Sequence, residues 1–162
     1  MHVFSDYVDA INAKWDISTW HDPFALTLTL RQKAKNAQFK GAGAPTSPLI
    51  DYSRNFRHFM NVLNTSVYQN RFRRGQTRLR VFAVAEHHLA GRLHYHAAVE
   101  RPQHVERDDF EERIAKAWRK THWGHEHMQI TPNADKGWQH YLLKTKSKGY
   151  LPDHIDWANC HL

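Results

Sequence analysis

The sequence has little cysteine and no long hydrophobic stretch. Cys160 is the single cysteine among 162 residues, which excludes an internal disulfide and argues against a cysteine-rich structural zinc site. One thiol fits a reducing interior. No apolar run approaches the roughly 20 residues that a membrane-spanning helix needs. The mixed, acidic start at residues 1–10 does not resemble a signal peptide. With 41% hydrophobic residues, we expect a globular domain with a real core.

Acidic residues are missing from two long stretches of the chain. No Asp or Glu occurs from Tyr52 to Ala85 or from Lys136 to Pro152, and the formal net charge is +7. Such a balance attracts polyanions, and we expect contact with nucleic acid rather than only a solvated basic face. The predicted DNA-binding side chains come from these stretches and from a basic mobile loop at 31–48: Arg31, Lys33, Lys35, Arg54, Arg57, Arg71, Arg73, Arg74, Arg78, Arg80, Lys146 and Lys148.

Hydrophobic periodicity predicts the helices and strands. Alternation of apolar and polar residues predicts strands at 24–30, 79–86, 91–100 and 127–131. Apolar residues at spacings of three and four predict helices at 51–70, from 108 onward and at 135–146, after a partly helical lead-in at 1–22. Asp51 is the predicted cap of the first of these helices. Asp108 and Glu111 form a predicted capping box for the second.

The order of these elements predicts the fold class. Its core, β-α-β-β-α-β, is the ferredoxin-like split βαβ arrangement. We therefore expect a single α+β domain over residues 1–162, with four or five mainly antiparallel strands. The two amphipathic helices are expected to cover one face of the sheet. The other face is expected to carry the active site.

Two histidines share one face of the strand at 91–100. Successive side chains of a strand point to opposite faces, so Leu93 and Tyr95 face the core while His94 and His96 point away from it. The two imidazoles lie about 7 Å apart along the strand. Neutral imidazoles are good metal ligands. A pair of surface histidines, in a chain with 14 of them, is the plainer interpretation.

A tyrosine in the last predicted helix lies among lysines. Tyr141 and Lys144 are three residues apart and share a face of that helix. The surrounding positive charge is expected to lower the pKa of the phenol. An amphipathic helix with a half-buried tyrosine is the plainer interpretation.

Three ordered motifs resemble the nuclease domain of rolling-circle replication initiators, the Rep branch of the HUH endonuclease superfamily. Phe24–Leu30 resembles the first motif, and His94–Tyr95–His96 is similar to the His-hydrophobic-His second motif. Tyr141–Lys144 is similar to the Tyr-x-x-Lys third motif. The family often takes a carboxylate eight residues before the first histidine as a third metal ligand, and Glu86 stands at that spacing. The resemblance covers about residues 22–150, while the long loop at 31–48 and the lack of a following helicase domain depart from it.

The resemblance implies a sequence-specific endonuclease and strand transferase that acts on single-stranded DNA. Glu86, His94 and His96 would hold one Mn²⁺ or Mg²⁺. Tyr141 would attack the scissile phosphate to form a 5′-phosphotyrosine, and Lys144 would assist. Nicking and rejoining an origin, expected to be a stem-loop, would initiate rolling-circle DNA replication of a plasmid or virus. The expected place of action is the cytoplasm of a bacterial host or the site where the replicon is copied.

Other classes stay open at this point. A single-strand transposase or relaxase belongs to the same superfamily, and the lysine of Tyr-x-x-Lys favours a replication initiator. A non-catalytic RRM-like module for single-stranded nucleic acid would share the fold and the basic surface. Such a module needs exposed aromatic residues on the central strands, where this chain has His94 and His96. Metal-dependent nicking separates the two classes.

Overall fold

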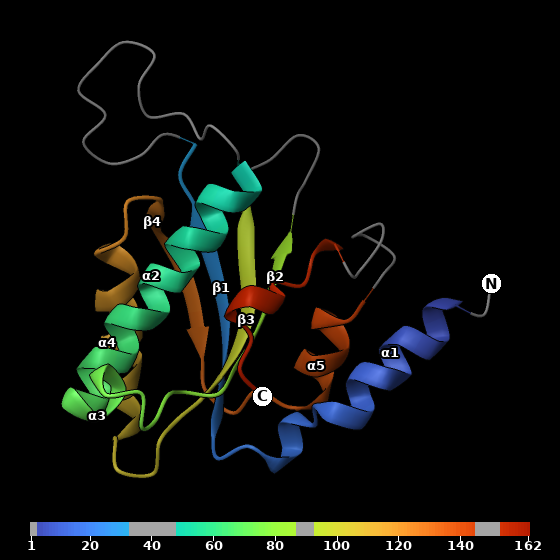
Figure 1. Ribbon diagram of the computed structural model, residues 1–162, viewed down its shortest axis with the longest axis horizontal. Coiled ribbons are helices and arrows are strands. Elements are labelled where there is room, and N and C mark those ends of the chain that lie inside the picture. The colour runs from blue at the N-terminus through green and yellow to red at the C-terminus, as the bar shows by residue number, and fades with distance from the viewer. Residues whose placement is uncertain (1–2, 33–47, 87–92, 145–152) are drawn as a thin grey trace.

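The computed structural model describes residues 3–32, 48–86, 93–144 and 153–162. In these ranges the elements are α1 (Val3–Lys14), η1 (Ile17–Thr19), β1 (Pro23–Leu30), α2 (Pro48–Tyr68), α3 (Asn70–Arg73), β2 (Val81–Glu86), β3 (His94–Glu100), α4 (Arg107–Arg119), β4 (Gly124–Thr131), α5 (Lys136–Leu142) and η3 (Trp157–Asn159) (Figure 1). Every helix in the described part of the chain is too short or too polar to cross a bilayer. Most of the predicted loop at 31–48 lies outside the described residues.

The four strands form one antiparallel sheet in the order β2-β3-β1-β4. This order agrees with the split βαβ arrangement, so the predicted α+β fold is confirmed. Thr27 of β1 pairs with His96 of β3. One step closer to the hairpin, His94 pairs with Thr29 on one side and with Glu86 of β2 on the other. The register therefore places the two histidines between β1 and the end of β2.

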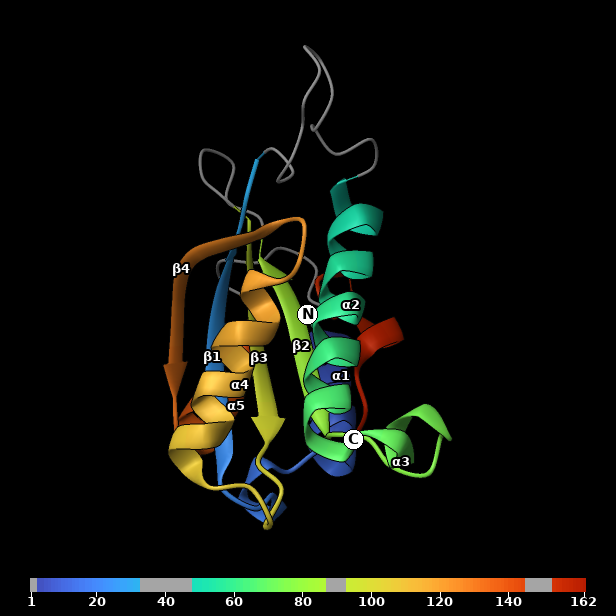
Figure 2. The same cartoon turned by 90° about the vertical axis from the view of Figure 1, so that its left-hand side faces the viewer.

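One face of the sheet packs against α2 and α4, which lie side by side (Figure 2). The apolar stripes predicted for both helices are buried here, including Phe56, Phe59 and Trp118. Tyr95 points to this face, where its ring stacks on that of Phe56 at a centroid distance of 4.6 Å. Its hydroxyl donates a hydrogen bond to Asp156 at 2.9 Å. Tyr95 is thus a structural residue, as the strand alternation predicts.

The second face, expected to lie open, is partly covered by α1, η1 and α5. Trp15 stacks on Phe82 of β2 with ring centroids 4.0 Å apart, and Trp20 belongs to the same cluster. All six residues of β2 are buried, so this strand shows no alternation that could reveal a second core. The candidate site consequently lies at the margin of a hydrophobic cluster rather than on a bare sheet.

The C-terminal segment lies along the outer edge of β2. Isolated antiparallel bridges join Val81 to His161 and Val84 to Ile155. The carboxylate of Asp156 accepts hydrogen bonds from side chains of β3 and α2. These contacts fix the segment to the sheet and to the first helical layer together.

Helix ends are where the sequence predictions are wrong. Because α2 begins at Pro48, Asp51 lies inside its first turn and does not cap it. The N-cap of α4 is Glu106, with no side-chain cap hydrogen bond, so the predicted capping box of Asp108 and Glu111 does not form. The acidic residues of that first turn still favour the helix through its dipole. The helix α5 ends at Leu142, before its predicted end at 146.

Candidate active site

Glu86, His94 and His96 gather on the second face of the sheet, where β2 and β3 meet α5. Their arrangement follows from the alternation of β3, since Tyr95 belongs to the first core while His96 contacts α5. Glu86 is the cross-strand partner of His94. Two strands joined by one hairpin therefore bring the three predicted ligands to one corner of the sheet.

Glu86 and His96 form a buried pair. Oε2 of Glu86 lies 2.6 Å from Nε2 of His96, and both side chains are less than a tenth exposed. On the other side of the ring, Nδ1 of His96 lies 3.1 Å from Oγ1 of Thr27. In a neutral imidazole, Nε2–H donates to the carboxylate, and Nδ1 then accepts the hydroxyl hydrogen of Thr27. The ring of His96 is thus fixed from both sides.

His94 lies one step farther toward the hairpin and is partly exposed. Its ring centroid is 6.3 Å from that of His96. Two imidazoles and a carboxylate fit a divalent cation such as Mn²⁺ in their donor chemistry. Within the described residues, however, no three His, Cys, Asp or Glu side chains are gathered closely enough to hold a metal ion. The predicted ligand set thus has one pair in contact, and its third member lies nearby.

Tyr141 of α5 lies against the ring of His96. The two ring centroids are 5.3 Å apart and the planes are nearly perpendicular at 83°. Trp138, one helical turn earlier, stacks on the Tyr141 ring at 5.0 Å and 15°. Its indole N–H donates to the carbonyl of Ala97 in β3 at 3.0 Å. The phenol is thereby clamped between Trp138 and His96, while 40% of Tyr141 remains exposed.

Two side chains hold α5 in this position. Oδ1 of Asp135 accepts a hydrogen bond from the Trp138 backbone N–H at 3.2 Å and so caps the helix. Gln139, which is 2% exposed, accepts a hydrogen bond from the Ile17 N–H at 2.9 Å and donates one to the carbonyl of Trp15 at 2.9 Å. Sequence reasoning missed Gln139 and the role of Trp138. The helical spacing of Trp138 and Tyr141 is a signal that could have revealed the stack.

The pKa of the Tyr141 phenol is raised, first by burial and then by the negative charge of Glu86. The expectation that neighbouring lysines lower this pKa is therefore wrong for the protein alone. Lys144 follows the end of α5, and its side chain is exposed. Its backbone N–H donates to the Tyr141 carbonyl at 3.2 Å, so the two residues meet across a turn and do not share a helix face.

The predicted DNA-binding arginines do not gather around Tyr141. Arg54 and Arg57 belong to α2, in the layer on the opposite face of the sheet, and Nε of Arg57 donates to Asn159 at 3.1 Å. Arg71, Arg73 and Arg74 are exposed in and directly after α3. These side chains form a basic surface behind the candidate site, so their role in DNA binding stays a prediction.

The remaining predicted DNA contacts lie at other places. Arg78 and Arg80 precede β2, and the six residues from Arg80 to Glu86 span about 20 Å of strand. Arg80 lies 3.8 Å from Glu100, and Arg78 contacts His161 at 2.7 Å. Nε of Arg31 donates to the carbonyl of Gly124 at 2.9 Å. Four predicted contacts fall outside the described residues: Lys33, Lys35, Lys146 and Lys148.

Comparison with known proteins agrees with this arrangement. The sequence profile of a replication-associated protein family, described by its member ORF2, matches residues 23–150, from the start of β1 to beyond α5. Searches of curated proteins and of solved structures find no match. Because the matched residues make up well over half of the chain, it belongs to this replication-associated protein family, a family of rolling-circle replication initiators.

Proposed function

We propose that this chain nicks single-stranded DNA at a replication origin, with Tyr141 as the nucleophile. The observation that carries the proposal is the contact of the Tyr141 ring with His96, whose imidazole in turn contacts Glu86 at 2.6 Å. A hydroxyl nucleophile beside imidazole and carboxylate donors is the arrangement that metal-assisted phosphoryl transfer requires. Membership in a family of replication initiators supports DNA as the substrate.

The proposed reaction exchanges one phosphate ester for another. The phenol oxygen of Tyr141 attacks phosphorus, and its proton passes to solvent. The bond between phosphorus and the 3′ oxygen of the preceding nucleotide breaks, and that oxygen takes up a proton. The products are a 5′-phosphotyrosine and a free 3′-hydroxyl. Because the covalent link conserves the energy of the broken ester, a 3′-hydroxyl can attack it and rejoin the strand.

Each side chain has a role in this proposal. Glu86, His94 and His96 would hold one Mn²⁺ or Mg²⁺, which would require the contact between Glu86 and His96 to open. When bound, the cation supplies positive charge that polarises the phosphate and offsets the carboxylate beside the phenol. Thr27 orients His96 through Nδ1, in the manner of outer-shell partners of metal-binding histidines. The exposed side chain of Lys144 can balance charge on the phosphate.

The test is formation of a covalent protein–DNA adduct. Wild type and Tyr141→Phe are incubated with Mn²⁺ and labelled single-stranded oligonucleotides that carry candidate stem-loop origins, and then separated by denaturing electrophoresis. Wild type should give a shifted DNA-linked band. Tyr141→Phe keeps the ring and its stacking on Trp138 but lacks the attacking oxygen, so it should give none.

Tyr68→Phe is the matched control, because this tyrosine lies on α2 in the opposite layer. It should form the adduct at the wild-type rate. His94→Ala should fold normally and lose the dependence on Mn²⁺. An adduct band that persists in Tyr141→Phe would disprove the assignment of the nucleophile.

A further inference from the structure

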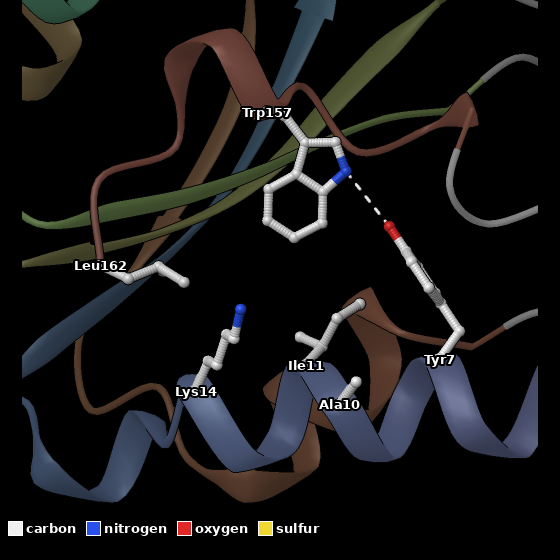
Figure 3. Close-up of a pocket in the computed structure, with 6 residues that line it drawn as sticks. All are labelled: Tyr7, Ala10, Ile11, Lys14, Trp157 and Leu162. Atoms are coloured by element: carbon white, nitrogen blue, oxygen red, sulfur yellow. Dashed lines mark hydrogen bonds between the residues drawn. The ribbon is translucent and has the colours of Figure 1, made fainter.

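A small apolar pocket lies between α1 and the C-terminal segment, away from the candidate active site. Its volume is about 190 Å³, and it is lined by Tyr7, Ala10, Ile11, Lys14, Trp157 and Leu162 (Figure 3). The pocket is thus built by two segments from opposite ends of the chain. Both segments lie outside residues 23–150, the part that matches the replication initiator family. This chain has therefore added the pocket to the family domain.

The pocket presents an aromatic ring that is held in a fixed orientation. The indole N–H of Trp157 donates to the hydroxyl of Tyr7 at 3.2 Å (Figure 3). The edge of the Trp157 ring also meets Phe82 of β2, with centroids 6.1 Å apart and an angle of 87°. Despite these contacts, 46% of Trp157 is exposed. A fixed and exposed aromatic face is suited to stacking against a flat ring.

Exposed apolar side chains concentrate at this pocket. Among the described residues, only four large hydrophobic side chains are exposed, and two of them, Trp157 and Leu162, line it. Tyr141, the proposed nucleophile, is the one other aromatic residue in that set. Leaving a tryptophan and a leucine in water at one place costs hydrophobic free energy, which binding of a ring would recover.

Size and charge narrow the occupant. Pockets for whole drug-sized ligands hold about 300–1,000 Å³, so this one fits a single planar ring. Lys14 projects from α1 into the space beneath Trp157 and Leu162 (Figure 3). Neither of the aspartates of α1, Asp6 and Asp9, lines the pocket. A ring attached to an anionic group complements this combination.

We propose that the pocket binds one unpaired nucleobase of single-stranded DNA, stacked on Trp157, with its phosphate beside Lys14. Stacking of bases on aromatic side chains is tolerant of sequence and adds affinity. The proposal rests on single-stranded DNA as the partner in the proposed function, but not on the nicking reaction. The pocket would therefore hold DNA without taking part in chemistry.

The experiment measures the affinity of the full chain for fluorescently labelled oligo-dT of increasing length by anisotropy, without metal. Trp157→Ala should weaken binding about tenfold, in the range known for loss of one stacked base. This loss should appear only once the oligonucleotide is long enough to reach the pocket. Trp157→Phe keeps a stacking face and should stay within about threefold of wild type. Lys14→Ala should weaken binding and reduce the slope of log affinity against log salt by about 0.7.

Ile50→Ala is the matched control, because Ile50 is a similarly exposed hydrophobic residue on α2 and should leave affinity unchanged. Thermal unfolding checks that each variant is folded. Wild-type affinity of a folded Trp157→Ala variant at every length would overturn the proposal, and would leave an aromatic side chain of another protein as the occupant. If wild type forms no covalent adduct while Trp157→Ala still loses affinity, the nicking proposal fails and the nucleobase pocket stands.

Discussion

Gln139 offers the sharpest test of how α5 is held on the sheet. This side chain is 2% exposed and joins the helix to the segment between α1 and β1. Its Oε1 accepts the Ile17 N–H at 2.9 Å, and its Nε2 donates to the Trp15 carbonyl at 2.9 Å and to Asn12 at 2.8 Å. Gln139→Leu keeps most of the volume and removes all three hydrogen bonds.

The expected loss of stability follows from the groups left behind. Asn12 is partly exposed and can turn to water. The Ile17 N–H and the Trp15 carbonyl are buried, and each unpaired group costs about 1–3 kcal/mol. The free energy of unfolding should therefore fall by about 2–6 kcal/mol. For a chain of this size that lowers the melting temperature by roughly 5–20 °C.

Activity should fall together with stability, because Tyr141 lies two residues from Gln139 on the same helix. The assay is urea unfolding followed by fluorescence, together with the rate of adduct formation well below the melting temperature. His140→Ala, an exposed neighbour on α5, is the control and should change neither quantity by much. If Gln139→Leu unfolds within about 0.5 kcal/mol of wild type, a loss that would count as surface-like, the buried hydrogen bonds do not anchor the helix.

Two further predictions follow from neighbouring contacts. Trp138→Leu should slow adduct formation by about tenfold with DNA affinity unchanged, whereas Trp138→Phe should restore the rate, because only an aromatic ring stacks on Tyr141; equal rates in both variants would argue against positioning. Burial raises the pKa of the Asp22 carboxyl, but hydrogen bonds from Arg107 and Arg101 outweigh it, so the pKa lies below its usual value. Its stabilising contribution is present above the unfolded pKa of about 4 and is lost as pH falls. The stability difference between wild type and Asp22→Asn should therefore be constant at neutral pH and shrink below about pH 4; a difference that does not shrink would contradict this linkage.

The sheet and its first core could be predicted because their signals are local. Alternation in β1 and β3 and the helical stripes of α2 and α4 each fix which side chains face inward. The same alternation placed His94 and His96 on one face, and the eight-residue spacing placed Glu86 beside them. Helix caps were less predictable, since Asp51 and several residues around it can each begin α2.

The second core could not be predicted, because it depends on contacts between distant segments. The stacking of Trp15 on Phe82 joins α1 to β2, and no local pattern in either segment announces it. The raised pKa of Tyr141 has the same origin. Lysine spacing indicated the opposite direction, but burial and the Glu86 carboxylate, 55 residues earlier in the sequence, decide it. Clamping of the phenol by Trp138 likewise becomes visible only when α5 is seated on β3.

The contact of the C-terminal segment with β2 has a consequence for where this domain can be cut. A fragment trimmed to residues 23–150 would keep every motif of the family, yet the outer edge of β2 would lose its partners at His161 and Ile155. Phe82 and Val84 would also face water once α1 is removed, and an uncovered apolar edge strand invites pairing with another chain. In this protein, the segment that its family shares is smaller than the segment that must fold together.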